Sequence, residues 1–137
     1  MNITLRAGEK LYINGAVIRT DRKATIELLN DATFLLETHV MQASEATTPI
    51  RQIYFVIQVM LMDPPSSKAT GELARSLVDK AVDAFANPDV KAGLRGIVDL
   101  INRSRYFEAM KTLRGLYPLE QREMFPEDAT ANKSNAA

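Results

Sequence analysis

The most strongly apolar stretch of the chain lies at residues 49–62, with the sequence PIRQIYFVIQVMLM. Its apolar residues follow helical spacing on one side and cover most of the other side, so a helix here would be buried nearly all round. Thr48 is a suitable N-cap, Pro49 suits the first helical turn, and residues 63–65 (DPP) would end the element abruptly. Its β-branched residues would also suit a buried strand, but the length between these two ends favours a helix. The pattern therefore predicts a central core helix, too short for a bilayer span of about 20 residues.

Upstream of this helix, short runs of alternating apolar and polar residues predict strands joined by tight turns. Asn14-Gly15 is the strongest turn signal, because this pair suits a two-residue hairpin. Such a turn fixes the register of the flanking strands, so Leu11 lies opposite Ile18 on an apolar face. The other face of the hairpin carries Lys10, Tyr12, Val17 and Arg19. Further strands are expected at residues 3–5, 24–29 and 33–37, with turns at 21–23 and 30–31.

Beyond residue 66, the spacing of apolar residues predicts three amphipathic helices with short connections. The first carries an apolar stripe of Leu73, Leu77, Val78, Ala81, Ala84 and Phe85. The second starts at an Asn87 N-cap and carries Val90, Leu94, Ile97, Val98 and Ile101, with Gly93 and Gly96 on its flank for close helix approach. The third starts at a Ser104 N-cap and carries Tyr106, Phe107, Met110, Leu113 and Tyr117. Gly115 and Pro118 are expected to end it, with one or two further turns at 119–125.

These patterns together indicate an α+β fold, in which a small N-terminal antiparallel β-sheet or half-barrel is followed by a bundle of about four helices. A chain of 137 residues, 46% hydrophobic and 25% charged, suits one compact domain. Within it we expect a β-rich segment at 1–45 and a helical segment packed on it at 46–125. Residues 126–137 lack apolar anchors and are expected to form a disordered tail.

Little in the sequence could carry catalysis, so an enzyme is not expected. The chain has no cysteine and a single histidine, His39, which excludes thiolate chemistry and a metal site built on several histidines. It also lacks phosphate-binding loops, dinucleotide-binding loops and serine nucleophile motifs, so no cofactor and no metal are expected. The N-terminus has no apolar segment typical of a signal peptide or membrane anchor, and cysteine absence fits a reducing compartment. We therefore expect a cytoplasmic protein without membrane contact.

The placement of charge is more informative than the net charge, which is zero. The first 23 residues hold Glu9 and Asp21 against a larger set of cations, namely Arg6, Lys10, Arg19, Arg22 and Lys23. On the hairpin, Lys10 and Arg19 share a face with Tyr12. Cations around an aromatic ring suit single-stranded RNA, which offers both phosphates and bases that can stack. These six residues are the first candidate RNA-binding surface, although a solvated outer sheet face would have the same composition.

A second basic group lies on the later predicted helices. Between residues 91 and 114, six cations outnumber two acidic residues and give a net charge of +4. The candidates for a second basic surface there are Arg95, Arg103, Arg105, Lys111 and Arg114. This group could extend an RNA track, form the polar rim of a helix bundle, or dock an acidic partner.

Several phrases of the sequence are specific enough to indicate a family. They are LRAGEKLYINGAVIR at 5–19, IELLNDATFLLE at 26–37, ATTPIRQIYFVIQVMLMDP at 46–64 and LRGLYP at 113–118. With these phrases the chain resembles the FlbT family of flagellum-biosynthesis regulators over roughly residues 2–125. The resemblance implies a small cytoplasmic bacterial factor that acts after transcription. Such a factor would associate with the leader of flagellin messenger RNA and change its stability or translation, with repression as the expected sign.

A fainter likeness concerns the strand region. The Gly8-Glu9 pair after the first strand and residues 26–30 (IELLN) before another strand are similar to CsrA-type translational regulators. That likeness implies RNA-leader binding by intertwined β-rich dimers. Arg6, at the end of the first strand, fits such a contact. Residues 38–39 depart from that family, which has a basic RNA-contacting residue after the last strand.

Two functions therefore remain open. The first is a non-enzymatic regulator that binds the 5′ leader of flagellin mRNA through the β segment, with the helices as a scaffold. The alternative is a protein-interaction adaptor or chaperone-like factor that controls flagellin through contacts with flagellin or another flagellar regulatory protein. Zero net charge, a sheet too small to bury itself well and the CsrA-like strand order also favour a homodimer formed through the β segment.

Overall fold

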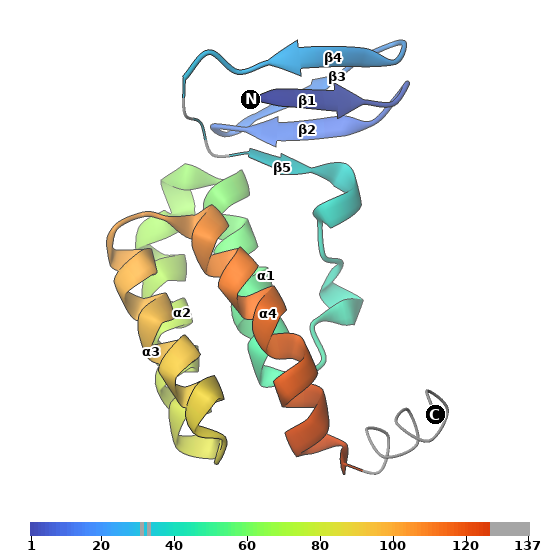
Figure 1. Ribbon diagram of the computed structural model, residues 1–137. Coiled ribbons are helices and arrows are strands. Elements are labelled where there is room, and N and C mark those ends of the chain that lie inside the picture. The colour runs from blue at the N-terminus through green and yellow to red at the C-terminus, as the bar shows by residue number, and fades with distance from the viewer. Residues whose placement is uncertain (31, 33, 127–137) are drawn as a thin grey trace, which may run out of the picture.

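Strands occupy the N-terminal part of the computed structural model and helices the rest (Figure 1), which confirms the α+β class. The structure describes residues 1–30, 32 and 34–126. The strands are β1 (Asn2–Leu5), β2 (Lys10–Ile13), β3 (Ala16–Arg19), β4 (Ala24–Glu27) and β5 (Phe34–Leu36). Short 3₁₀ turns follow at η1 (Glu37–His39), η2 (Ala43–Glu45) and η3 (Pro64–Ser66). The helices are α1 (Pro49–Met62), α2 (Ser67–Ala84), α3 (Pro88–Asn102) and α4 (Tyr106–Met124).

The strands pair into small antiparallel sheets. β1 pairs with β4, and β2 pairs with both β3 and β5. The hairpin has the predicted register, since Leu11 lies opposite Ile18 and Tyr12 lies opposite Val17. Asn14 and the glycine after it form the turn with positive φ angles of 49° and 80°. This left-handed conformation is the one that the Asn-Gly pair tolerates best.

The two faces of the β2 sheet have different neighbours. One face packs on the β1–β4 sheet, and Ile3, Leu5 and Leu11 are buried between them as a small cluster (the β core). The other face carries Tyr12 and Leu35 and packs against the cluster formed by the helices. In Figure 1 the strands therefore form a layer (the β layer) across one end of the helices, with β5 nearest to them.

The helices form an up-and-down bundle (the helical bundle), in which consecutive helices are neighbours and α4 packs back against α1. The helix α1 has the predicted bounds and the predicted N-cap, because the Thr48 hydroxyl accepts a hydrogen bond from the Arg51 N–H at 3.3 Å. Ile53 and Ile57 have no exposed surface, which confirms α1 as the central core helix.

One polar residue of α1, Gln58, is buried against the linker that precedes the helix. The Met41 N–H donates to Gln58 Oε1 at 2.7 Å, and Gln58 Nε2 donates to the Met41 carbonyl at 2.9 Å. Because both polar ends of the amide are satisfied, its burial is tolerated. The pair holds the linker between β5 and α1 against the helical bundle.

The structure corrects the predicted apolar stripe of α2. Leu73 is 50% exposed and Ala84 is also exposed, whereas Gly71 and Ala74 lie on the buried face. Small residues at these two positions let α2 approach its neighbours closely. The rest of the stripe is buried or partly buried, and Asn87 is the N-cap of α3 as predicted, accepting a hydrogen bond from the N–H of residue 89 at 2.8 Å.

Two further predictions about α4 are wrong. Ser104 is not an N-cap, because it has a positive φ of 58° in the turn before the helix, and Arg105 occupies the flanking position. The helix also continues through Pro118, where the pattern predicted its end. Pro118 is exposed, and α4 continues past it although proline cannot donate the hydrogen bond to the carbonyl four residues earlier. The buried turns on either side keep the helix continuous.

Two glutamates of α4 accept hydrogen bonds from backbone N–H groups at or just before the starts of other helices. Glu120 is 2% exposed, and its carboxylate accepts hydrogen bonds from the Thr48 hydroxyl and from the Ile50 N–H at 2.8 Å. One turn later, Glu123 accepts from the N–H groups of residues 86–87 at 2.9 and 2.8 Å. A carboxylate at a helix N-terminus satisfies orphan N–H groups and interacts favourably with the helix dipole. The end of α4 therefore fixes the first turn of α1 and the connection that leads into α3.

The predicted close approach between helices is confirmed at one of the two glycines of α3. A Cβ added at Gly93 would lie 2.9 Å from Leu116 Cδ2 of α4, whereas nothing lies within 4 Å of one added at Gly96.

Two predicted segments lie wholly or partly outside the described residues. They are the second residue of the turn predicted at 30–31 and all of the tail predicted at 126–137 except Pro126.

Candidate nucleic-acid interface and neighbouring pockets

The topology gathers the N-terminal cations at one end of the β layer. In the β2–β3 ladder Lys10 lies opposite Arg19, and β1 ends beside the start of β4. The β1–β2 and β3–β4 turns therefore lie side by side, and the Gly8 N–H donates to the Thr20 carbonyl at 2.8 Å. This end of the layer, on the right in Figure 1, carries the set that we call the basic end, consisting of Arg6, Lys10, Arg19, Arg22 and Lys23.

The cations of the basic end are little neutralised. Arg22 pairs with Asp21 at 3.5 Å, but both side chains are more than 80% exposed, so the pair is weak. Within residues 1–30, 32 and 34–126, the other cations of the basic end form no ion pair. Lys10 and Arg19 stand opposite each other across the ladder, where like charges repel. An anion bound between them would relieve that repulsion.

Two other nearby carboxylates, those of Glu9 and Glu37, accept hydrogen bonds from backbone N–H groups. Glu9 Oε1 accepts from the Arg6 N–H at 3.3 Å, and Glu37 Oε2 accepts from the Lys10 N–H at 2.9 Å. These bonds hold the β1–β2 turn and η1 in place while the guanidinium and ammonium groups remain available. The arrangement can therefore bind a chain of phosphates through exposed cations on a fixed backbone.

Tyr12 lies in a different environment from the cations of the first candidate RNA-binding surface. It lies opposite Leu35 in the β2–β5 ladder and is partly buried against the cluster of the helical bundle. The side chain thus packs the β layer onto the bundle, and a nucleobase could meet only the uncovered part of the ring. Stacking of RNA on Tyr12 stays a prediction.

The helical cations are divided between different environments. At the α3–α4 corner, Arg103 pairs with Asp99 at 3.3 Å and Arg105 pairs with Glu108, so the charge there is largely balanced. The other three candidates form no ion pair within the described residues: Arg95 and Lys111 lie on the exposed sides of α3 and α4, and Arg114 is partly buried on α4. The second predicted basic surface is therefore less concentrated than the basic end, and its role in binding stays a prediction.

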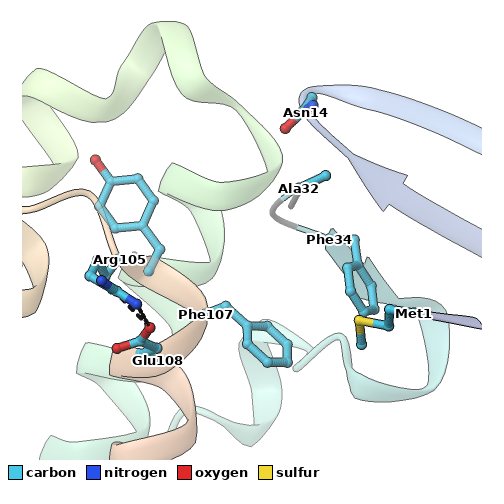
Figure 2. A pocket seen from close by; sticks show the side chains of 8 residues that line it. Met1, Asn14, Ala32, Phe34, Arg105, Phe107 and Glu108 are labelled. Carbon is cyan, nitrogen blue, oxygen red and sulfur yellow. Dashed lines mark hydrogen bonds and ion pairs between the residues drawn. The ribbon is translucent and has the colours of Figure 1, made fainter. Parts of the chain in front are cut away.

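A cleft of about 460 Å³ lies between the β layer and the α3–α4 corner (Figure 2). Phe34 of β5 and Phe107 of α4 stack there, with ring centroids 5.7 Å apart and ring planes at 28°. Figure 2 shows the Arg105 guanidinium turned to the Glu108 carboxylate, so the cleft offers aromatic surface with balanced charge. Its wall is completed by Met1, Asn14, Ala32 and Tyr106. Such a surface suits an apolar peptide segment better than a polyanion.

A pocket of about 230 Å³ lies between η1 and the contact of α1 with α4. Tyr54 of α1 and Tyr117 of α4 meet here edge to face, with ring centroids 6.1 Å apart. The Tyr54 hydroxyl donates to the His39 carbonyl at 3.3 Å. In the part of the chain that the structure describes, the Tyr117 hydroxyl oxygen is buried without a hydrogen-bond partner. Arg114 also lines this site, which we call the tyrosine pocket (Tyr54, Arg114 and Tyr117).

Guanidinium groups surround the buried phenols. The Arg51 guanidinium lies over the Tyr117 ring, 4.9 Å from its centroid. Burial raises the pKa of Tyr117 well above its ordinary range, and the neighbouring Tyr54 adds to the rise, while Arg51 and Arg114 act against it. Burial also raises the pKa of Tyr54, against the effect of Arg114. Both phenols are therefore neutral hydrogen-bond donors at neutral pH.

Sequence reasoning missed the tyrosine pocket and the buried Glu120. The charge pattern places Arg114 with the other helical cations, and it does not show that Arg114 lies beside Tyr54 of α1. One signal was present, since Tyr117 and Glu120 continue the spacing of Met110 and Leu113 along the buried face of α4. A carboxylate at such a position indicates a buried polar contact.

The described residues hold no group of three or more His, Cys, Asp or Glu side chains that could bind a metal ion. None of their helices is long and apolar enough to cross a membrane.

Comparison with known proteins identifies the family. The family model described as flagellar protein FlbT matches residues 1–124. The probable flagellum biosynthesis repressor protein FlbT of Chelativorans sp. (strain BNC1) is 46% identical over 119 residues, which cover 87% of this chain and 82% of that protein. Its counterpart in Agrobacterium fabrum is 42% identical over 130 residues, covering 95% and 87%. The probable flagellum biosynthesis repressor protein FlbT 2 of Bradyrhizobium diazoefficiens is 48% identical over 121 residues, covering 88% and 89%.

No solved structure matches the chain. The family match includes the β layer and the helical bundle alike, so the sites described above lie within the shared region. The names of the relatives are those of repressors of flagellum biosynthesis, and the family is one of regulators and not of enzymes. As its sequence phrases implied, this chain belongs to the FlbT family of flagellar regulators.

Proposed function

We propose that this protein is a cytoplasmic repressor of flagellin expression that binds the 5′ leader of flagellin messenger RNA through the basic end. The relatives named as repressors of flagellum biosynthesis support the repressing role. The observation that carries the RNA contact is the basic end itself. There, neighbouring turns of the β layer bring five cations together, and most of these cations lack an acidic partner among the described residues.

The electrostatics of the whole chain favour this local site. Because the net charge is zero, the protein has no overall attraction to polyanions, and any binding must come from a concentrated patch. Each phosphate that a cation neutralises on a single strand contributes about 0.7 to the slope of log affinity against log salt concentration. For binding through the basic end, this slope should therefore correspond to the few cations that contact phosphates.

A pair of charge-matched variants tests this proposal. The basic-end variant combines Arg6→Gln, Lys10→Gln and Arg19→Gln. The bundle variant removes the same charge at three exposed helical positions, Lys68, Lys80 and Arg122. Fluorescence anisotropy with a labelled flagellin leader RNA should show about tenfold or greater weakening for the basic-end variant, with the salt slope lower by about 2. The bundle variant should bind like the parent protein.

Two results would contradict the proposal. Equal weakening in both variants would mean that RNA responds to total charge and not to the basic end. Unchanged binding in the folded basic-end variant, or no binding by the parent protein, would remove direct RNA binding through this surface.

A second function, that of a protein adaptor or chaperone-like factor, is favoured by the aromatic cleft in Figure 2. In that case an apolar segment of flagellin or of another flagellar regulatory protein would occupy the cleft. Phe107→Ser should then abolish flagellin binding in calorimetry, whereas Leu73→Ser on the exposed side of α2 should not. Flagellin binding that survives Phe107→Ser would exclude the cleft as its site.

We also propose that a second copy of this chain pairs with the free edge of β3. All four residues of β3 are exposed, including Val17 at 60% and Ile18 at 40%, and β2 is its neighbour on one side. Symmetric antiparallel pairing centred on Val17 would place Arg19 of one copy opposite Gly15 of the other, so like charges would stay apart. Light scattering should show a dimer that Val17→Lys dissociates and Leu73→Lys does not. A parent protein that is monomeric at high micromolar concentration would exclude it.

A further inference from the structure

The tyrosine pocket is connected to the basic end along one side of the molecule. The Lys10 N–H is bonded to the Glu37 side chain at 2.9 Å, and Glu37 is the first residue of η1. His39 is the last residue of the same turn, and its carbonyl accepts the hydrogen bond from Tyr54. A 3₁₀ turn of three residues is about 6 Å long. In Figure 1, η1 leads from the right-hand end of the β layer toward α4. The basic end and the tyrosine pocket are therefore joined through one short turn, which a bound strand could follow.

The donors of the pocket suit an anionic oxygen. Arg114 is partly buried, and within the described residues no carboxylate lies within ion-pairing distance of it. The Tyr117 hydroxyl is a buried donor that the described part of the chain leaves unpartnered. A guanidinium presents its N–H groups in a planar fork that matches the oxygens of a phosphate, and a phenol adds a directional donor.

The surroundings of these donors favour a singly charged ligand. Val40 and Met41 supply apolar wall, which strengthens a charge-assisted hydrogen bond relative to one in water. Glu45 lines the same pocket and would repel a multiply charged group. A phosphodiester carries one negative charge, so it fits this balance better than a terminal phosphate.

We propose that the tyrosine pocket binds one phosphodiester of the RNA strand held at the basic end, with Arg114 as the ion-pairing group and the Tyr117 hydroxyl as a hydrogen-bond donor. This inference rests on the proposed function and adds a second contact region to it. Tyr54 positions the pocket by joining α1 to η1. Arg51 stays on the ring face of Tyr117 and does not enter the contact.

The most specific test is Tyr117→Phe, which removes a single hydroxyl from the pocket. Leader RNA affinity should fall about threefold to tenfold, because a hydrogen bond to a charged group is lost. The salt slope should not change, because no charge is removed. The melting temperature should stay the same or rise, since the hydroxyl has no partner in the described RNA-free protein and its burial is unfavourable. Tyr106→Phe, in the aromatic cleft, is the matched control and should bind like the parent.

Arg114→Gln tests the ionic part of the contact. Affinity should fall about tenfold, and the salt slope should fall by about 0.7. Arg122→Gln is the charge-matched control, because Arg122 lies on the same helix, is exposed and does not line the pocket. Equal weakening by both substitutions would show a general charge effect and would overturn the proposal.

A set of leader RNAs, each with one uncharged methylphosphonate linkage, locates the contacted phosphodiester. The parent protein should lose affinity at the linkage that occupies the pocket, and Arg114→Gln should be insensitive to substitution at that linkage. If the basic-end variant loses RNA while Tyr117→Phe and Arg114→Gln bind like the parent, this inference is wrong and the proposed function stands. If the parent protein binds no leader RNA, the proposed function and this inference both fail.

Discussion

The β layer and the helical bundle bury their apolar residues to different extents. The bundle encloses a continuous cluster that draws on every α-helix, with Ile57, Leu94 and Leu113 fully buried. The β core consists of Ile3, Leu5 and Leu11, and β3 is exposed along its whole length. Burial of apolar surface is the main favourable contribution to folding. We therefore infer that the bundle supplies most of the stability, and that the β layer uses its exposed ends and edge to present charge and backbone groups.

The largest expected effect is the loss of stability when a charge is placed in the core of the helical bundle, compared with the same charge on β3. Ile57→Asp should lower the free energy of unfolding by about 4 kcal/mol or more, which is most of the stability of a small domain. Ile18→Asp, at a 40% exposed position of β3, should cost less than about 1 kcal/mol. Urea denaturation of both variants measures the difference. If Ile57→Asp unfolds at the same urea concentration as the parent, α1 is not the centre of the core.

Cavities in the two cores give a sharper comparison at a smaller scale. Leu113 and Leu5 have no exposed surface. Leu113→Ala and Leu5→Ala should therefore each lower the free energy of unfolding of the region that contains the residue by about 2–4 kcal/mol. Native-state hydrogen exchange should show that Leu113→Ala lowers protection throughout the protein. Leu5→Ala should lower it mainly in β1, β2 and β4, because local opening of a small core need not open the bundle. Equal loss of protection everywhere would mean that the two regions unfold as one unit.

The smallest expected effect concerns close packing inside the bundle. Gly96→Ala should raise stability by about 0.5–1 kcal/mol, because alanine favours a helix and nothing lies within 4 Å of the new Cβ. Gly93→Ala gains the same propensity but places Cβ 2.9 Å from Leu116 Cδ2, so it should be less stable than Gly96→Ala by about 1–3 kcal/mol. Thermal unfolding of the two variants provides the test. Equal melting temperatures would show that Leu116 moves aside freely.

Features set by neighbouring residues were predictable from the sequence. The Thr48 and Asn87 caps and the hairpin turn follow from side chains one to three residues away from the groups that they affect. The exposure of Leu73 was not predictable, because the phase of α2 is set by the helices that it contacts and Gly71 faces Met60 of α1. Tertiary packing also carries α4 through a proline, against its local preference.

The candidate sites likewise combine local features, which the sequence predicts, with contacts between distant segments, which it does not. The hairpin register placed Lys10 and Arg19 together from the sequence, but the pairing of β1 with β4, which completes the basic end, joins segments about 20 residues apart. The tyrosine pocket draws Tyr54 from α1 and Tyr117 from α4. Periodicity within one helix carries no information about which residue of another helix will face it.

The glutamates at the end of α4 have a consequence for the order of events during synthesis. Glu120 lies 72 residues after Thr48, so α1 leaves the ribosome long before the carboxylate that completes its first turn. A nascent chain halted before residue 120 also lacks Glu123, so the Ile50 N–H in the first turn of α1 and the N–H groups of residues 86–87 before α3 would then lack these carboxylate partners. We expect the finished protein to resist proteolysis better than such a truncated chain, because closing contacts between distant residues removes freedom from the segments they join. Incomplete translation products would therefore be degraded more readily than the full-length regulator.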